Sequence, residues 1–209
     1  LSWRSDRRRT HWLAGRLAAL KVAHAQGWEV ERIEAHPVTG APRLRLAGHP
    51  THTRQGLLVD SPRIHPLSIT HSGHWAMAAV LPGHGIMGVD YEVGVRDKLY
   101  LKKQVCSRAE ILHHHLEDEA LALTTRCARL ARIWVLKEAL LKAYGVGLVA
   151  GLQDFMALSL ALDTPLRFVA TNPLHEAIPH PLPDTLWAAV GEFEGHPLAL
   201  VAALDTIPS

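Results

Sequence analysis

Residues 125–144 constrain the fold of this chain more than any other segment, because they predict one long amphipathic helix. Trp134, Glu138 and Lys142 recur every four residues there, so all three lie along one face of that helix. On an open surface, Glu138 and Lys142 would form an ordinary ion pair worth about 0.2–0.5 kcal/mol. A tryptophan on the same stripe indicates instead that this face is at least partly covered, so the carboxylate and the ammonium need another explanation.

A second group of charges precedes this helix. Asp90 and Glu92 stand two residues apart in a segment, residues 86–93, that predicts a strand. Alternation puts both carboxylates on one face, roughly 6–7 Å apart at about 3.3 Å per residue, and they repel unless a cation joins them. Oxygen ligands of this kind suit Mg²⁺. Alone, this pair would be better explained as a solvent-facing strand edge, but the charged stripe on the helix favours a magnesium site.

The rest of the chain alternates helices with meandering strands in both halves. Helices are expected at residues 10–25 and 107–119, and strands at 30–35, 43–46, 67–71, 75–81, 155–161, 186–193 and 198–203, with a loop over 49–66 that a short strand at 56–59 interrupts. Gly145 and Gly147 are expected to end the long helix. This order predicts an α+β protein of two similar lobes that join near residues 82–88.

Two further patterns look like binding sites but are better explained by local structure. Residues 83–88 match G-x-G-x-x-G, which binds dinucleotides only where a strand ends and a helix begins. The residues after Gly85 predict a strand, so a hairpin turn is the better interpretation. Three consecutive histidines at 113–115 point in different directions on a helix and cannot converge on one metal, so a solvated helix face is expected.

Composition excludes several other classes of protein. The 209 residues are 48% hydrophobic and 20% charged, which is typical of a globular protein with a sizeable core. A net charge of +2 gives no nucleic-acid footprint, and no apolar run approaches the roughly 20 residues that a membrane helix needs. The two cysteines, Cys106 and Cys127, form no C-x-x-C pair, so a reducing, cytoplasmic setting is expected.

Taken together, these residues resemble two hallmark motifs of the 4′-phosphopantetheinyl transferase superfamily. Residues 88–92 match the strand motif G-[IV]-D-x-E, and residues 134–148 match the helix and turn motif W-x-x-K-E-A-x-x-K-x-x-G-x-G-L. Residues 67–72 resemble the S-x-[ST]-H-S strand of the family, and residues 15–19 resemble its G-R-x-A-A helix. The chain departs from the family at Ala41, which stands where a G-[KR]-P turn often carries a basic residue.

The resemblance implies an enzyme that moves the phosphopantetheine arm of coenzyme A to a serine of an acyl or peptidyl carrier protein and releases 3′,5′-ADP. The chain resembles the two-lobed monomeric class typified by the surfactin-synthetase activator. This class implies lobes at residues 1–86 and 87–209, related by a pseudo-twofold axis, with the active site in the cleft between them and the metal motifs in the second lobe. The carrier would serve fatty-acid, polyketide or nonribosomal peptide biosynthesis, and the chain would act as a monomer or as part of a larger synthase.

The resemblance also implies a role for each charged residue. Mg²⁺, or Mn²⁺ in its place, is expected on Asp90, Glu92 and Glu138, with Glu110 as a further candidate ligand. Catalysis is expected from Asp90, Glu138 and Lys142, in which Glu138 takes the serine proton and Lys142 stabilises the leaving phosphate. Contacts with coenzyme A are expected from His71, Thr70, Arg43, Arg16 and Lys142, and Arg43 is the candidate to replace the basic residue that Ala41 lacks.

Some of these features have a second interpretation. Ser107 and Glu110 match the capping box S-x-x-E, which by itself explains Glu110. Residues 96–103 contain four basic groups and one acid around Tyr100, which fits either a rim that seats an acidic carrier or a solvated linker.

Two other functions fit part of the pattern. A transferase-like lobe that only docks partners would tolerate the loss of an acid, yet Asp90, Glu92, Glu138 and Lys142 are all present. Another magnesium-dependent phosphodiester enzyme, such as a nuclease, would have an E-x-K on a strand and a basic groove, whereas Lys142 follows Glu138 by four residues on a helix.

Overall fold

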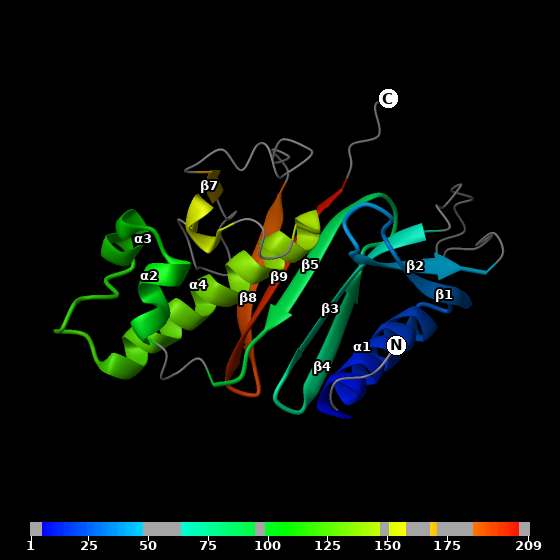
Figure 1. Ribbon diagram of the computed structural model, residues 1–209, viewed down its shortest axis with the longest axis horizontal. Helices are drawn as coiled ribbons and strands as arrows, with labels where there is room; N and C mark the ends of the chain where they lie inside the picture. The colour runs from blue at the N-terminus through cyan, green and yellow to red at the C-terminus, as the bar shows by residue number, and fades with distance from the viewer. Residues whose placement is uncertain are drawn as a thin grey trace.

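A computed structural model describes residues 6–47, 64–94, 99–146, 151–157, 168–170 and 186–204 of the chain. The first half contains α1 (Asp6–Ala25), β1 (Val30–Ala35), β2 (Pro42–Leu46), β3 (Ile64–Ser72) and β4 (Trp75–Val80). These strands form one antiparallel sheet in the order β1-β2-β3-β4, and α1 packs against β3 and β4 (Figure 1).

The second half begins with β5 (Gly85–Tyr91) and is built around the long helix α4 (Leu123–Tyr144). Its other elements are η2 (Leu99–Leu101), α2 (Lys102–Val105), α3 (Arg108–His113), η4 (Leu152–Asp154), β6 (Phe155–Ala157), β7 (Phe168–Ala170), β8 (Trp187–Phe193) and β9 (His196–Leu204). A second antiparallel sheet has the order β5-β9-β8, and α4 crosses its face (Figure 1). The predicted α+β class is therefore confirmed; the pseudo-twofold axis and the boundary near residue 86 stay predictions.

Three hydrophobic clusters form the described core. One lies between α4 and the strands β8 and β9, where Leu136, Ala139 and Val201 are fully buried. A second joins α4 to α2 and α3, and a third lies between α1 and the first sheet. Among the described residues, no helix combines the length and the apolar character that crossing a membrane requires.

Most element predictions hold, with two corrections. The long helix ends at Gly145 in a left-handed conformation (φ 67°), as predicted, while Gly147 lies outside the described residues. The helix expected at 107–119 is too long, because α3 ends at His113 and His115 turns the chain with a φ of 54°. Strand β3 begins at Ile64, so the end of the expected loop 49–66 belongs to the sheet. The strand expected at 56–59 lies outside the described residues.

The two sheets meet where β3 lies beside β5, and side-chain hydroxyls join them there. Alternate residues of β3 point toward β5, and each hydroxyl oxygen accepts a backbone N–H from the facing strand. The bonds run from Val89 N to Ser68 Oγ (2.9 Å), from Tyr91 N to Thr70 Oγ1 (3.3 Å) and from Val93 N to Ser72 Oγ (2.9 Å). We call this row of three hydroxyls the β3–β5 seam.

On its other side, β5 touches α4 at a glycine. A Cβ atom on Gly88 would overlap the carbonyl oxygen of Ala139 and would lie 2.8 Å from the carbonyl carbon of Ala139 and from the amide nitrogen of Ala143. All three atoms belong to the helix backbone, so they cannot turn aside as a flexible side chain does. Gly88 therefore allows α4 to lie against the strand that carries Asp90. That strand was expected to extend to residue 93 but ends at Tyr91, so Glu92 directly follows it.

The Gly88→Ala variant is expected to lower the free energy of unfolding by about 1–3 kcal/mol, since an added methyl group in a packed interface forces the backbone to move. Urea denaturation of the variant and the wild type measures this difference. A variant as stable as the wild type would show that α4 does not rest on β5 at this position.

Candidate active site

The charged residues of α4 and β5 meet at the β3–β5 seam. Lys142 Nζ lies 2.6 Å from Asp90 Oδ1 and donates a second hydrogen bond to the carbonyl oxygen of Val89 at 3.3 Å. Asp90 is 3% exposed, and its Oδ1 also accepts the Thr70 hydroxyl at 3.0 Å. Trp134, Glu138 and Lys142 are all partly buried, so the prediction that their face of the helix is covered is confirmed.

Glu138 lies close enough to the acids of β5 to feel their charges. Burial raises the pKa of Glu138, and the negative charge of Asp90 raises it further, as Glu92 does more weakly. Lys142 opposes this effect by favouring the ionised form. The structure therefore brings Asp90, Glu92, Glu138 and Lys142 into one electrostatic cluster, although 46 residues separate Glu92 from Glu138 in the sequence.

The chemistry of this cluster fits a hard divalent cation. Three carboxylates gather around a single ammonium, and Asp90 Oδ2 is buried with no hydrogen-bond partner among the described residues. A buried carboxylate oxygen without a partner is costly, and a cation would satisfy it. Within the described part of the chain, no three His, Cys, Asp or Glu side chains meet around one point. The carboxylates of this cluster therefore do not form a complete ligand set around one point in the described geometry.

Glu110, the further candidate ligand, lies in a different buried network. Its Oε2 accepts the Ser107 N–H at 2.9 Å and Lys137 Nζ at 2.7 Å, and its Oε1 accepts the Ala157 N–H at 2.8 Å. The predicted capping box is present, with the Ser107 hydroxyl accepting from Glu110 N. Both carboxylate oxygens of Glu110 thus hold protein groups in place, and its role as a metal ligand stays a prediction without support from these contacts.

Lys137 is the residue of this network that sequence reasoning left without a role. Its side chain is 0% exposed, and Nζ donates to Glu110, to the Val105 carbonyl at 2.8 Å and to the Leu152 carbonyl at 2.7 Å. Lys137 therefore ties α2, α3 and η4 to α4. One signal in the sequence could have found it. Lys137 stands next to Glu138 in the helix, so its side chain points away from the charged stripe and toward a different face.

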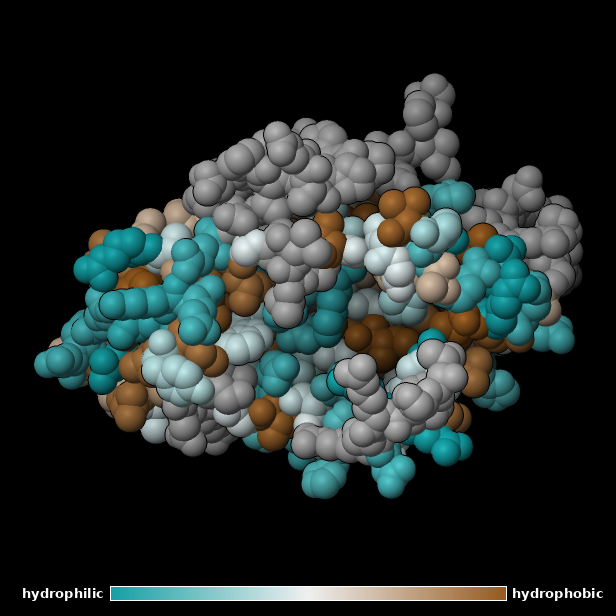
Figure 2. Space-filling model, in the orientation of Figure 1, coloured by the Kyte–Doolittle hydropathy of each residue, from teal (hydrophilic) through white to brown (hydrophobic). Residues whose placement is uncertain are grey.

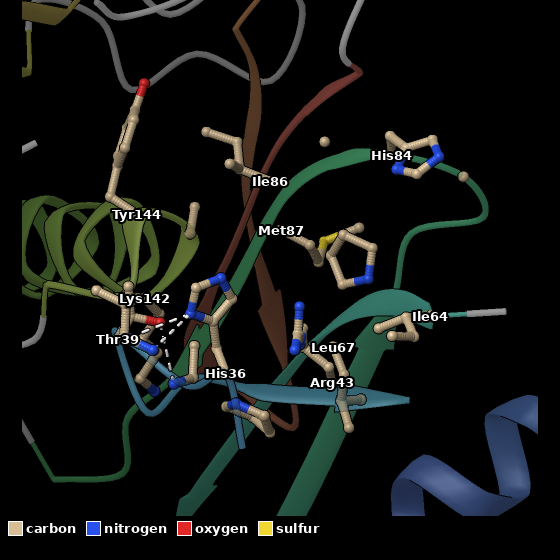
Figure 3. A pocket seen from close by; sticks show the side chains of 18 residues that line it. His36, Thr39, Arg43, Ile64, Leu67, His84, Ile86, Met87, Lys142 and Tyr144 are labelled. Atoms are coloured by element: carbon tan, nitrogen blue, oxygen red, sulfur yellow. Dashed lines mark hydrogen bonds between the residues drawn. The ribbon is translucent and has the colours of Figure 1, made fainter. Parts of the chain in front are cut away.

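A cavity of about 690 Å³ opens beside the charged cluster. Figure 2 shows this face of the molecule hollowed near its centre, with brown hydrophobic side chains at the bottom of the hollow. In Figure 3, Lys142 and Thr39 lie at one end of the cavity, and His84 and Ile64 lie at the other. Arg43 also lines it, and its Nε is buried without a hydrogen-bond partner among the described residues.

A smaller cavity of about 320 Å³ lies between α1 and the first sheet. It is lined by basic side chains from both elements, namely Arg8, His11, Arg16 and His71, with one acid, Glu34. The rings of His11 and His71 are 4.7 Å apart, and the Arg16 guanidinium lies 3.6 Å above the Trp12 ring. Partial burial lowers the pKa of His71, and the nearby positive charges of His11 and Lys142 lower it further. An anionic ligand beside His71 would favour its protonated form and so oppose this lowering of its pKa.

Among the predicted contacts with a nucleotide, Arg16 and His71 share the smaller cavity, and Arg43 and Lys142 share the larger one. Thr70 lines neither of these two cavities and is 2% exposed. Sequence reasoning missed Arg8 and His11 as members of the smaller cavity, because only the packing of α1 against β3 brings them beside His71.

Two surface predictions have different outcomes. The solvated histidine face is correct for His113 and His115 but wrong for His114, which is 8% exposed and lies 2.7 Å from the Ala157 carbonyl through Nε2.

In the basic segment 96–103, residues 96–98 lie outside the described residues. Tyr100 is 72% exposed, and Lys102 forms an ion pair with Glu117 at 3.4 Å.

Comparison with known proteins identifies a family that matches this chain. The sequence model of the 4′-phosphopantetheinyl transferase superfamily matches residues 86–195, which is just over half of the chain. Among solved structures, the holo-ACP-synthase from Plasmodium yoelii is similar, with 15% identity and a TM-score of 0.44 over 57% of this chain and 94% of that one. No curated protein matches the chain.

Proposed function

This chain belongs to the 4′-phosphopantetheinyl transferase superfamily, and we propose that it transfers the phosphopantetheine arm of coenzyme A to a serine of an acyl or peptidyl carrier protein. One observation carries this proposal: Lys142, which belongs to the charged cluster with Asp90, Glu92 and Glu138, lines one end of a cavity large enough for a nucleotide. An ammonium and three acids at such a place suit a reaction at a phosphate.

The reaction requires a base, a cation and a site for the leaving group. The serine Oγ attacks the β-phosphorus of coenzyme A, the bond from that phosphorus to the bridging oxygen breaks, and 3′,5′-ADP leaves with the electron pair. Glu138 accepts the serine proton as general base. Lys142 stabilises the charge that develops on the leaving phosphate.

Asp90, Glu92 and Glu138 are the residues that would hold Mg²⁺, or Mn²⁺ in its place. When bound, such an ion neutralises the charge of the pyrophosphate. Asp90 also keeps Lys142 beside the future reaction centre through their 2.6 Å ion pair. The three acids and the lysine thus come from the end of β5, the residue after it and α4, and Gly88 lets the strand and the helix lie in contact.

The two cavities suit the two ends of the coenzyme A nucleotide. The larger one, with its apolar floor and Arg43, fits the adenosine, and its end at Lys142 fits the pyrophosphate. The smaller one, with Arg8, Arg16 and His71, fits the 3′-phosphate. Arg43 would take the place of the basic residue missing at Ala41.

The carrier is proposed to dock on the basic segment that follows β5 in the chain, where Tyr100 in η2 offers an exposed aromatic ring. Both halves of the proposed site come from one chain, with β3 in the first half and β5 and α4 in the second, so a monomer of the two-lobed class suffices. The lobes are proposed at residues 1–86 and 87–209.

A direct transfer assay tests the proposed function. The protein is incubated with coenzyme A, Mg²⁺ and a set of apo-carriers from fatty-acid, polyketide and peptide synthases, and each carrier is weighed by mass spectrometry. At least one carrier is expected to gain a single arm, with no gain when EDTA is added or when the carrier serine is replaced by alanine. Binding of coenzyme A and carrier without transfer would instead indicate a docking domain, and cleavage without transfer would indicate a phosphodiesterase.

The nucleotide contacts are tested by comparing coenzyme A with dephospho-coenzyme A. The His71→Ala variant is expected to bind coenzyme A about tenfold more weakly, since a hydrogen bond to a charged group contributes about 1.5–3 kcal/mol. Its affinity for dephospho-coenzyme A is expected to stay near that of the wild type. Because the pKa of His71 is lowered, wild-type binding of coenzyme A should tighten as the pH falls through that pKa, and the variant should not follow.

His74→Ala is the matched control, because His74 is an exposed histidine in the turn that follows β3. It is expected to bind both compounds as the wild type does. Equal losses on both compounds in His71→Ala would mean that His71 does not contact the 3′-phosphate.

A further inference from the structure

Asp90 on β5 and Glu92, which directly follows β5, are both held by hydroxyl groups of the β3–β5 seam. The Thr70 hydroxyl donates to Asp90 Oδ1 at 3.0 Å, and the Ser72 hydroxyl donates to Glu92 Oε2 at 3.1 Å. The two hydroxyls stand two residues apart on β3, and the two acids stand two residues apart at the end of β5 and directly after it. The contact therefore repeats with the period of the strands, one hydroxyl to each acid.

Each of these hydroxyls has little freedom to do anything else. Thr70 Oγ1 accepts the Tyr91 N–H, and Ser72 Oγ accepts the Val93 N–H, so the oxygen of each is anchored to the backbone of β5. A hydroxyl has only one proton to donate, and in both residues that proton faces a carboxylate. The backbone of β5 thus fixes the hydroxyl, and the hydroxyl fixes one oxygen of the acid.

We infer that Thr70 and Ser72 are positioning residues that set the orientation of Asp90 and Glu92 for a divalent cation, an inference that rests on the proposed function. In Asp90, the hydroxyl and Lys142 both hold Oδ1, which leaves the buried Oδ2 for the cation. Groups that hold metal ligands in this way typically change metal affinity by about 10- to 100-fold when they are lost.

This role differs from the one expected for Thr70 from sequence. A contact with coenzyme A needs an accessible hydroxyl. Thr70 is only 2% exposed, and its hydroxyl already donates its hydrogen bond to Asp90. Ser72 was not among the residues expected to act. It belongs to the stretch that resembles the S-x-[ST]-H-S strand, but only the packing of β3 against β5 brings its hydroxyl to Glu92.

The seam itself supplies a matched control in Ser68. Its Oγ accepts the Val89 N–H at 2.9 Å, as the other two hydroxyls accept theirs, and it is 3% exposed. Among the described residues, Ser68 makes no hydrogen bond to a carboxylate. Ser68→Ala therefore removes a bond between the sheets and leaves the acids untouched.

The test measures Mn²⁺ binding directly, by the paramagnetic resonance of free Mn²⁺, on the full chain without coenzyme A or carrier. Thr70→Val and Ser72→Ala are each expected to weaken Mn²⁺ binding by about 10- to 100-fold, Thr70→Ser is expected to restore it, and Ser68→Ala is expected to bind as the wild type does. Folding is checked by circular dichroism. If Thr70→Val does not fold, Ser72→Ala decides the question, because Ser72 is only partly buried.

Three outcomes would overturn the inference: wild-type affinity in Ser72→Ala, an equal loss in Ser68→Ala, or no binding of Mn²⁺ by the wild type. The transfer assay separates this inference from the proposed function. A wild type that binds Mn²⁺ with the expected pattern but transfers nothing would leave the positioning role standing and remove the activity. A wild type that transfers the arm while all variants bind Mn²⁺ equally would leave the proposed activity standing and remove the positioning role.

Discussion

Replacing Glu138 by glutamine is expected to lower kcat for arm transfer by about 100- to 10,000-fold, the range that a positioned general base contributes. Glutamine keeps the shape of the side chain but cannot accept the serine proton, and its amide is a poorer ligand for a cation. Transfer to a saturating apo-carrier, followed by mass spectrometry, measures the loss.

The same variant should fold at least as well as the wild type in metal-free buffer. Burial and the charge of Asp90 raise the pKa of Glu138, so its ionised form is less favourable in the folded than in the unfolded chain. Below the unfolded pKa both states are protonated and the substitution should change little. As the pH rises through the folded pKa, the wild type should lose stability relative to Glu138→Gln.

Glu119→Gln serves as the control for this substitution, because Glu119 is exposed in the turn between α3 and α4 and is not among the charges that shift the pKa of Glu138. It is expected to keep wild-type turnover. Near-normal turnover of a correctly folded Glu138→Gln would remove Glu138 from the mechanism, whatever the metal content of the preparation.

The second large effect is on stability. Lys137→Met is expected to lower the free energy of unfolding by about 3–5 kcal/mol, because it leaves the Glu110 carboxylate buried without its cation. Both side chains are 0% exposed, and their atoms are 2.7 Å apart. The carbonyls of Val105 and Leu152 lose their donor as well. Urea denaturation at pH 7 measures the difference.

A double-mutant cycle identifies the cause of that loss. Adding Glu110→Gln to Lys137→Met removes the unpaired charge, so the double variant should recover part of the stability that Lys137→Met loses. Lys21→Met on α1 is the surface control, since Lys21 is exposed, and a change within about 0.5 kcal/mol is expected. A cost below about 1 kcal/mol for Lys137→Met would contradict a buried ion pair.

The elements of the proposed site were predictable where one periodicity was enough. Asp90 and Glu92 share a strand face because strands repeat every two residues, and Glu138 and Lys142 share a helix face because helices repeat every 3.6 residues. The cover over this face was also predictable, since Trp134 stands on the same stripe.

The remaining contacts depend on which elements pack together, and no local pattern encodes that. Glu110 and Lys137 are 27 residues apart, and each has an adequate local explanation, a capping box for one and a helix position for the other. His114 is buried because its ring meets the Ala157 carbonyl, 43 residues later in the chain. Contacts of this kind appear only when the tertiary structure is known.

The seam between β3 and β5 has a mechanical consequence. Its hydroxyls stand at every second residue, so the two sheets can slide past each other only in steps of about 6.6 Å, since a one-residue slip turns every hydroxyl to the opposite face. Smaller sliding movements, or hinge opening along this line, would break all three hydrogen bonds and leave three backbone N–H groups without their acceptors. The two halves should therefore move as one rigid body, and the pocket should admit its substrate by the movement of side chains rather than by parting of the sheets.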